Sequence, residues 1–333
     1  MPDPKHPAGF RVGIVNSMTL AGNEIKSILS ERRFPFDKVV LLDSTGGETG
    51  ALTEVGDSPA VVVAVSDLEL EDCDLVFFCG PAEKNAEWIQ RMADDRFIAV
   101  DLSLPSSAED GKLAVAGVNL DEVDAADEIL ISPHPVAIPI AVILRQLQSL
   151  GRVESCTATV IQPASHFDQA GIDELVQQTI GVLNIQNVPK AIFDRQLAFN
   201  LYPAAEHQEA LVVSQIGALL GTKSQVALQI TQGTLFHGHT FSLFFRIDPS
   251  IVLESVRRSF AANPALTVAE SDDTYGTVDA AGRDDILIVE IRQDPTIAGG
   301  FWVWAVCDNL RRGSALNAVL IAEKVLFGSG LPN

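Results

Sequence analysis

The sequence predicts an α/β protein: a Rossmann-like parallel-sheet domain, then an α+β domain with a mainly antiparallel sheet. Two observations predict this. Short apolar segments alternate with helical patterns over the first third of the chain, whereas longer segments of alternating apolar and polar residues follow beyond Ser132. Unbroken apolar strands are typical of a parallel sheet covered on both faces, and alternation is typical of a sheet with one open face.

The order of expected elements supports this division. In the first part, strands are expected at Phe10–Val15, Val39–Asp43, Ala60–Val65, Asp74–Gly80 and Phe97–Leu102, and helices at Leu20–Arg32 and Glu83–Ala93. In the second part, strands are expected at Val153–Ile161, Gln225–Thr234, Thr240–Ile247, Ile286–Arg292 and Phe301–Cys307, and helices at Val136–Leu150, Ile172–Leu183 and Asn309–Phe327.

Composition excludes several classes of function. The 333 residues carry a net charge of −21, and such a surface repels phosphate backbones and anionic lipids, so neither nucleic acid nor a membrane is expected as a partner. No apolar run approaches the ~18 residues that span a bilayer, and the polar start does not resemble a secretory signal. A cytoplasmic location is therefore expected.

Cysteine and histidine spacing indicates no metal site. The four cysteines form no CxxC pair, and each lies in or beside an apolar stretch, where a thiol behaves as a small buried hydrophobe. His237 and His239 would share a strand face, but no third ligand is visible nearby. Ser165, His166 and Asp168 are the residue types of a hydrolytic triad, but triad members converge from separate segments.

Several segments resemble the aspartate-semialdehyde dehydrogenase family. The start of the chain (VGIVNSMTLAGNEIKSILSERRFPFDKVVLLDS) is similar to that family's first βαβ unit. AFNLYP at residues 198–203, FHGHT at residues 236–240 and the closing DNLRRGSALNAVLIAEKVL resemble its other signatures, in the same order. The resemblance implies a nucleotide-binding-type domain of residues 1–133 and 308–333, to which the last helix returns. It also implies a substrate and dimerisation domain of residues 134–307, a homodimer formed through that domain, and a small-molecule ligand in the interdomain cleft.

The resemblance also shows which catalytic groups are missing. The family nucleophile is a cysteine at the start of a helix, and the matching position is Pro135, which has neither a thiol nor a backbone N–H. His239 matches the family acid/base and Gln162 a glutamine near the nucleophile, so both are expected to be vestigial catalytic residues. Phe241 replaces an acidic residue, and Gln232 stands where an arginine would bind the substrate carboxylate.

The cofactor loop is similarly altered. The family's three glycines in G-x-x-G-x-x-G correspond to Asn16, Thr19 and Gly22, so only the last glycine remains to let the backbone approach a pyrophosphate. Asp43, followed by Ser44, lies where an acid would bind an NAD ribose. Asp43 would favour NAD over NADP if NAD(P) binds, and a strand-end turn residue is the plain alternative.

Two functional hypotheses follow from the resemblance. The first is an aspartate-semialdehyde dehydrogenase-like dimer without the phosphorylating dehydrogenase activity, similar to the cysteine-less Usg-type proteins, with a scaffold or binding role. The second is an NAD(P)-dependent oxidoreductase of the family with altered chemistry or substrate, because simple hydride transfer needs an acid/base and a cofactor but no nucleophile.

Overall fold

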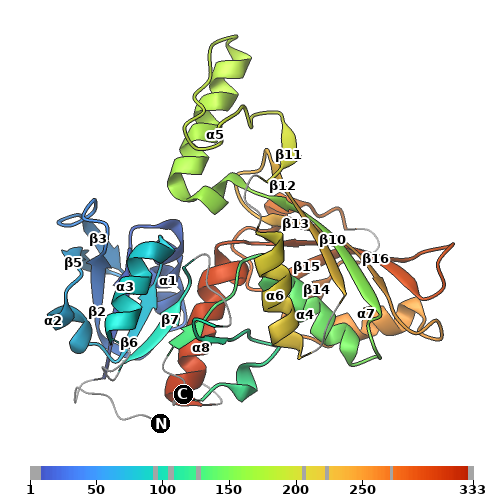
Figure 1. Ribbon diagram of the computed structural model, residues 1–333, viewed down its shortest axis with the longest axis horizontal. Helices are drawn as coiled ribbons and strands as arrows, with labels where there is room; N and C mark the ends of the chain where they lie inside the picture. Colours follow the sequence, from blue (N-terminus) through green and yellow to red (C-terminus); the bar gives the residue numbers. More distant parts are fainter. Residues whose placement is uncertain are drawn as a thin grey trace. The chain divides into compact units, whose positions relative to one another are not determined.

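The computed structural model describes residues 9–92, 97–103, 109–124, 129–204, 208–221, 225–270 and 273–328. It divides into two compact units (Figure 1), the first made of Met1–His134 and Ser314–Asn333 and the second of Pro135–Gly313. Residues 308–313, expected in the first unit, belong to the second. The reason is local: the Asp308 carboxylate accepts from Gly282 N, and the Asn309 amide oxygen accepts from Gly238 N, both at 2.8 Å.

The first unit contains a seven-stranded sheet in the order β5-β2-β1-β6-β7-β9-β8, with every described pair parallel. Its strands are β1 (Phe10–Val15), β2 (Phe36–Asp43), β5 (Val63–Ala64), β6 (Leu75–Phe78), β7 (Ile98–Asp101), β8 (Lys112–Leu113) and β9 (Ile129–Ile131). Its helices are α1 (Leu20–Glu31), α2 (Asp67–Glu71), α3 (Ala82–Met92) and α8 (Leu316–Phe327). The Rossmann-like parallel sheet is confirmed.

One expected strand of this sheet was wrong. Ala60–Val65 is divided between β4 (Ser58–Val61), which forms an antiparallel hairpin with β3 (Leu52–Val55), and β5, which alone joins the sheet. The division falls at Val62, whose N–H donates to Ala51 and whose carbonyl accepts from Gly50. These bonds tie Val62 to the segment before β3 rather than to the sheet.

Helix α8 packs in the core of the first unit. The Phe327 ring meets Phe10 and Phe34 edge-on at 5.5 Å, and Arg32 donates two hydrogen bonds to Glu323 at 2.6 and 2.7 Å. The α-helix begins at Leu316, not at Asn309 as expected, and a π-helical turn over Arg311–Ala315 precedes it.

The second unit contains a seven-stranded mixed sheet in the order β11-β12-β10-β13-β16-β15-β14. Its strands are β10 (Ser155–Gln162), β11 (Leu201–Pro203), β12 (Val226–Gly233), β13 (His239–Arg246), β14 (Leu266–Val268), β15 (Ile286–Gln293) and β16 (Gly300–Cys307). The pairs β10·β12 and β14·β15 are parallel and the other four are antiparallel.

The two faces of this sheet differ as the alternation predicts. On β10, Cys156, Ala158, Val160 and Gln162 are buried, whereas Thr157 and Thr159 are exposed. Helices α4 (Ala137–Gln148), α6 (Glu209–Leu220) and α7 (Leu253–Ala261) lie on one face (Figure 1). The opposite face includes Trp304, which is 39% exposed.

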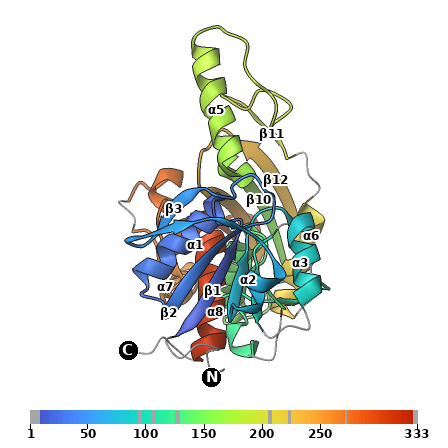
Figure 2. The ribbon, with the colours of Figure 1, turned by 90° about the vertical axis from the view of Figure 1, so that its left-hand side faces the viewer.

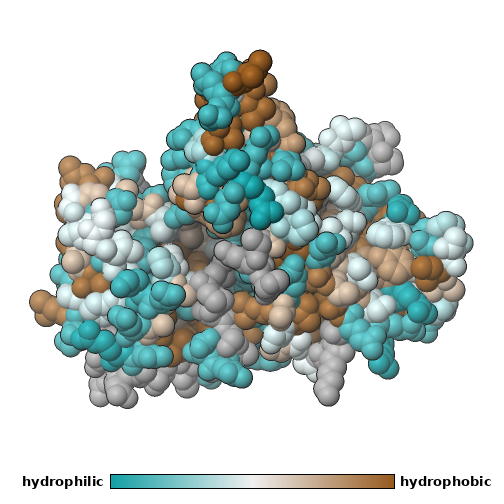
Figure 3. Space-filling view, turned by 45° about the horizontal axis from the view of Figure 1, so that its top comes forward, coloured by the Kyte–Doolittle hydropathy of each residue, from teal (hydrophilic) through white to brown (hydrophobic). Residues whose placement is uncertain are grey.

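An arm projects from the second unit (Figure 2). It consists of α5 (Asp168–Leu183), the following segment and β11. Gln178 holds it together: its Nε2 donates to Pro189 O and Arg195 O at 2.7 and 3.0 Å, and its Oε1 accepts from Leu197 N and Ala198 N. The arm surface carries apolar side chains (Figure 3), namely Val176, Ile180, Leu183 and Ile185.

No helix in the described ranges combines the length and apolarity needed to cross a bilayer.

Candidate functional site

Five side chains form one row at an edge of the second unit's sheet. Tyr202 pairs with Gln232, Gln232 with Gln162, and His239 with Cys307, and the pairing of Ile161 with Thr240 sets Gln162 beside His239. Directly paired residues point to the same face of a sheet. The structure therefore brings together both expected catalytic residues, Gln162 and His239, on the buried face.

The two glutamines are hydrogen-bonded to each other. Gln162 Nε2 donates to Gln232 Oε1 at 3.1 Å, and Gln232 Nε2 donates to the backbone carbonyl of Gln162, also at 3.1 Å. The side chains are 1% and 2% exposed. Among the described residues, no hydrogen-bond partner reaches Gln162 Oε1. The pair thus presents one buried acceptor that the protein leaves unused.

His239 follows a backbone turn that a second set of residues fixes. Asn309 Oδ1 accepts from Gly238 N at 2.8 Å, and Asn309 Nδ2 donates to Ser165 Oγ at 3.0 Å. Gly238 has φ +83°, and a Cβ there would lie 3.1 Å from Thr277 Cγ2, so this position requires glycine. Asn309 therefore positions the strand end that carries His239.

The alternative constellations do not assemble. His237 precedes β13 and is exposed, whereas His239 is fully buried within it, so the expectation of a shared strand face was wrong. The Ser165 hydroxyl bonds with Asn309 rather than with a histidine. In the described parts of the chain, no group of three or more His, Cys, Asp or Glu side chains could hold a metal ion.

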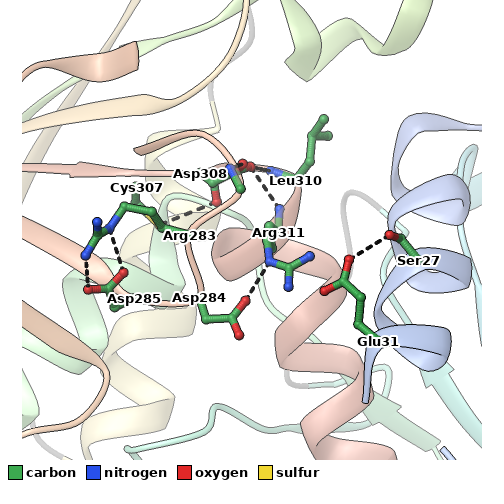
Figure 4. A network of polar contacts seen from close by, with 10 residues as sticks. Ser27, Glu31, Arg283, Asp284, Asp285, Cys307, Asp308, Leu310 and Arg311 are labelled. Atoms are coloured by element: carbon green, nitrogen blue, oxygen red, sulfur yellow. Dashed lines mark hydrogen bonds and ion pairs between the residues drawn. The ribbon is translucent and has the colours of Figure 1, made fainter. Parts of the chain in front are cut away.

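Cys307 ends the row on β16. Burial raises the pKa of its thiol, although the neighbouring Arg312 guanidinium acts in the opposite direction. Arg312 is 2% exposed, and burial lowers its own pKa. The segment from Cys307 to Arg312 is held by its own polar contacts. The Asp308 carboxylate accepts hydrogen bonds from the N–H groups of Leu310, Arg311 and Gly282, and the Arg311 side chain pairs with Asp284 (Figure 4). These bonds fix the segment that carries Arg312 near the Cys307 end of the row.

Pro135 lies beside the same segment. A Cβ at Gly313 would be 3.4 Å from Pro135 O and 3.5 Å from Pro135 Cβ. Helix α4 begins at Ala137, so Pro135 occupies the turn directly before the helix. The residue has no N–H, and it supplies neither a nucleophile nor a donor at this helix start.

The expected cofactor turn, in the first unit, is closed by its own hydrogen bonds. Asn16 has φ +55°, a conformation that asparagine tolerates better than most residues. Its Nδ2 donates to Cys79 O and Asn85 Oδ1, and its Oδ1 accepts from Ser44 N and Ser44 Oγ. All four hydrogen-bonding positions of the carboxamide are used. Asn16 thereby joins the carboxyl ends of β1, β2 and β6.

The backbone of this turn is also engaged. Asn16 N and Ser17 N both donate to Leu42 O, and Thr19 N donates to Asn16 O. The Thr19 side chain caps α1 by accepting from Gly22 N at 3.1 Å. A Cβ at Gly22 would lie 2.8 Å from Asn16 O, so the remaining glycine is needed for helix packing.

The Asp43 carboxylate accepts hydrogen bonds from the loop that follows it. Its carboxylate accepts from Thr45 N, Thr45 Oγ1, Gly46 N, Glu48 N and Thr49 Oγ1. Burial raises its pKa, but the hydrogen bonds outweigh this effect and lower the pKa to about 2. The carboxylate is thus an ionised turn residue whose acceptor capacity is already used.

The turn residues do not fit a dinucleotide pyrophosphate. In a phosphate-binding turn, backbone N–H groups point at the ligand and glycines let the backbone approach it. Here the N–H groups of residues 16, 17 and 19 bond within the protein. The Asn16 side chain also lies over Gly80, at the point between β1 and β6 where the strand order reverses.

Sequence reasoning missed several residues of these networks. Asn85 continues the Asn16 network by donating to Cys79 O and to Ser103 Oγ, at 2.8 and 2.6 Å. Asn309 and Arg312 were treated as part of a C-terminal helix. The one available signal was the density of polar residues in DNLRR, which is unusual for the start of a buried helix.

Family comparisons cover both units. The family model described as "Semialdehyde dehydrogenase, NAD binding domain" matches residues 11–126. The model described as "Semialdehyde dehydrogenase, dimerisation domain" matches residues 144–312, which is more than half of the chain.

Individual relatives are similar over nearly their full length. An aspartate-semialdehyde dehydrogenase of Rickettsia bellii is 25% identical, covering 95% of this chain and 98% of the relative. A USG-1 protein homolog of Pseudomonas aeruginosa is 28% identical, with the same coverage. A solved structure of a probable aspartate-semialdehyde dehydrogenase from Pseudomonas aeruginosa has a TM-score of 0.90 at 26% identity, covering 96% and 98% of the two chains.

Proposed function

Because the chain belongs to the semialdehyde dehydrogenase family, we propose that it is an aspartate-semialdehyde dehydrogenase-like dimer that lacks the phosphorylating dehydrogenase reaction and keeps a binding role, as a Usg-type paralogue. The observation that carries this proposal is Pro135 at the helix start where the family nucleophile is expected. Covalent acyl transfer needs a nucleophile whose electron pair attacks the carbonyl carbon, and proline has none.

No other cysteine offers a substitute. All four are buried. Burial raises the pKa of Cys156 to about 12 and also raises the pKa of Cys307, so both are thiols at neutral pH. A nucleophilic cysteine needs a lowered pKa in an electropositive, accessible position. The closed turn at Asn16 supports the same proposal, because the reaction also needs a bound dinucleotide.

The test is an activity assay on the purified full chain. With aspartate semialdehyde, inorganic phosphate and either NAD or NADP, we expect no phosphate-dependent formation of reduced cofactor. An active family member assayed in parallel serves as the positive control. Turnover that is lost in His239→Ala and retained in His237→Ala would overturn the proposal and assign an oxidoreductase reaction to this site.

We further propose that the homodimer forms through the open face of the second unit's sheet. Trp304 is 39% exposed on that face and pairs with Ser242 and Glu290 on the neighbouring strands. A half-exposed tryptophan on a sheet face is typical of an interface anchor.

Trp304→Glu is therefore expected to weaken the dimer by about 2 kcal/mol or more, because a charge would enter a desolvated interface. Sedimentation velocity over a concentration series measures the change. Leu68→Glu is the matched control, since Leu68 is 75% exposed in α2 of the first unit. An unchanged dimer in Trp304→Glu would place the interface elsewhere.

A further inference from the structure

We propose that the row at the sheet edge binds a neutral ligand through an N–H or O–H donor, such as a carboxamide, and discriminates against a carboxylate. This inference rests on the binding role proposed above and names the chemical class of the ligand. It depends on which way the side-chain amides of Gln162 and Gln232 face, and the backbone determines this orientation.

The first step is the orientation of Gln232. Its Nε2 lies 3.1 Å from the carbonyl oxygen of Gln162 and 3.5 Å from that of Gly233. Both neighbours are backbone acceptors and cannot donate. Reversing the amide would place Oε1 against two carbonyl oxygens, so the backbone fixes the NH2 group of Gln232 on that side.

The second step is the orientation of Gln162. Because the Gln232 NH2 group faces the carbonyls, Gln232 Oε1 faces Gln162 and needs a donor. Gln162 Nε2 provides it at 3.1 Å. The Gln162 amide is therefore also fixed, and its Oε1 must point away from Gln232.

The third step is the state of that oxygen. Gln162 is 1% exposed, and no described group donates to its Oε1. A buried acceptor without a partner is costly and rare in native proteins, so such an atom is expected to meet a donor that arrives from outside the chain. Gln162 is the last residue of β10 and His239 the first of β13, so the Gln162 side chain lies where these two neighbouring strands end, just before the 3-10 turn at Ala164–Phe167.

The fourth step is the charge of the ligand. An acceptor oxygen attracts N–H and O–H groups and repels a carboxylate oxygen. Beside Gln162 lie the neutral amide of Gln232 and the imidazole of His239. The guanidinium of Arg195 lies over the Tyr202 ring on β11, which is two strands away from Gln162. The buried cation Arg312 acts on Cys307, which lies on β16, two strands away from Gln162. A carboxylate at Gln162 would therefore meet an acceptor without a compensating charge.

The experiment is a calorimetric titration of the full-length protein with succinamide and with succinate. The two probes have similar size, but succinamide ends in carboxamides and succinate in carboxylates. We expect succinamide to bind at least about tenfold more tightly. Binding of neither probe at millimolar concentration, or equal binding of both, would overturn the inference. The dehydrogenase assay is independent of this titration, so a failure of either proposal is recognised separately.

The variant that tests the residue is Gln162→Leu. It removes the unused acceptor, and the double variant Gln162→Leu/Gln232→Leu also removes Gln232 Oε1, which would otherwise lose its donor and become a new unused acceptor. Replacing both partners of a hydrogen-bonded pair is nearly neutral for stability, so the double variant is expected to fold, as a thermal melt would check. Succinamide binding should fall at least about tenfold. Gln229→Leu, on β12 but exposed, is the matched control and should bind as the wild type does. Unaltered succinamide binding by Gln162→Leu would contradict the assignment.

Discussion

Gln178→Leu is expected to unfold the arm of the second unit while the rest of the sheet stays folded. The Gln178 amide satisfies two backbone N–H groups and two backbone carbonyls within the segment that follows α5. Leucine has similar volume but no polar atoms, so Leu197 N and Ala198 N would be buried without acceptors. Each unsatisfied buried group costs about 1–3 kcal/mol, and the total is about 3–5 kcal/mol.

Limited trypsin digestion measures this effect. Lys190 and Arg195 lie in the segment that Gln178 holds, and both are exposed, so loss of local order is expected to speed cleavage there by two orders of magnitude or more, as about 3 kcal/mol implies. Gln177→Leu is the matched control, because Gln177 is the exposed neighbour on α5. Equal cleavage rates in Gln178→Leu and the wild type would show that the arm is held by its apolar contacts instead.

Asn16→Gly and Asn16→Ala are expected to differ in stability by the cost of a left-handed backbone. Both variants lose the four side-chain hydrogen bonds, which leaves Ser44 N and Asn85 Oδ1 without these partners and costs about 2–5 kcal/mol. Alanine at φ +55° adds about 1–2 kcal/mol, whereas glycine adopts this conformation freely. Urea unfolding of both variants measures the difference. Equal stabilities would mean that the turn changes conformation when the carboxamide is removed.

Cofactor binding by the wild type tests the closed cofactor turn. Titration of the wild type with NAD and with NADP is expected to give no saturable heat at millimolar concentration, because the N–H groups of residues 16, 17 and 19 and the Asn16 carboxamide bond within the chain. Saturable binding by the wild type would contradict this account of the turn.

The sequence predicted the fold well where burial alone determines a strand. Phe10–Val15 is apolar at nearly every position, and its observed bounds equal the expected ones. The prediction failed where pairing determines the structure, as at Ala60–Val65, because apolar content does not say which neighbour a strand joins. Helix α6 was missed because its apolar residues occur all round, which gives no helical periodicity.

The sequence predicted which residues form the candidate site, but it did not predict how their polar atoms are oriented or engaged. Resemblance identified Gln162, His239 and Pro135, and strand register then placed the first two side by side. That Gln162 presents an oxygen and not an NH2 group depends on backbone carbonyls of two strands that are distant in sequence. Similarly, Asp43 was expected to be available to a ribose, and only the fold of residues 44–49 shows that its oxygens are engaged.

The four native cysteines can report the local unfolding of each unit, because each unit contains two buried thiols. Cys73 and Cys79 are buried in the first unit, Cys156 and Cys307 in the second, and none is more than 2% exposed. A thiol-specific reagent cannot reach any of them until the surrounding unit opens. Peptide mapping of labelled protein would therefore tell which unit loosens first under heat or denaturant, without any introduced probe.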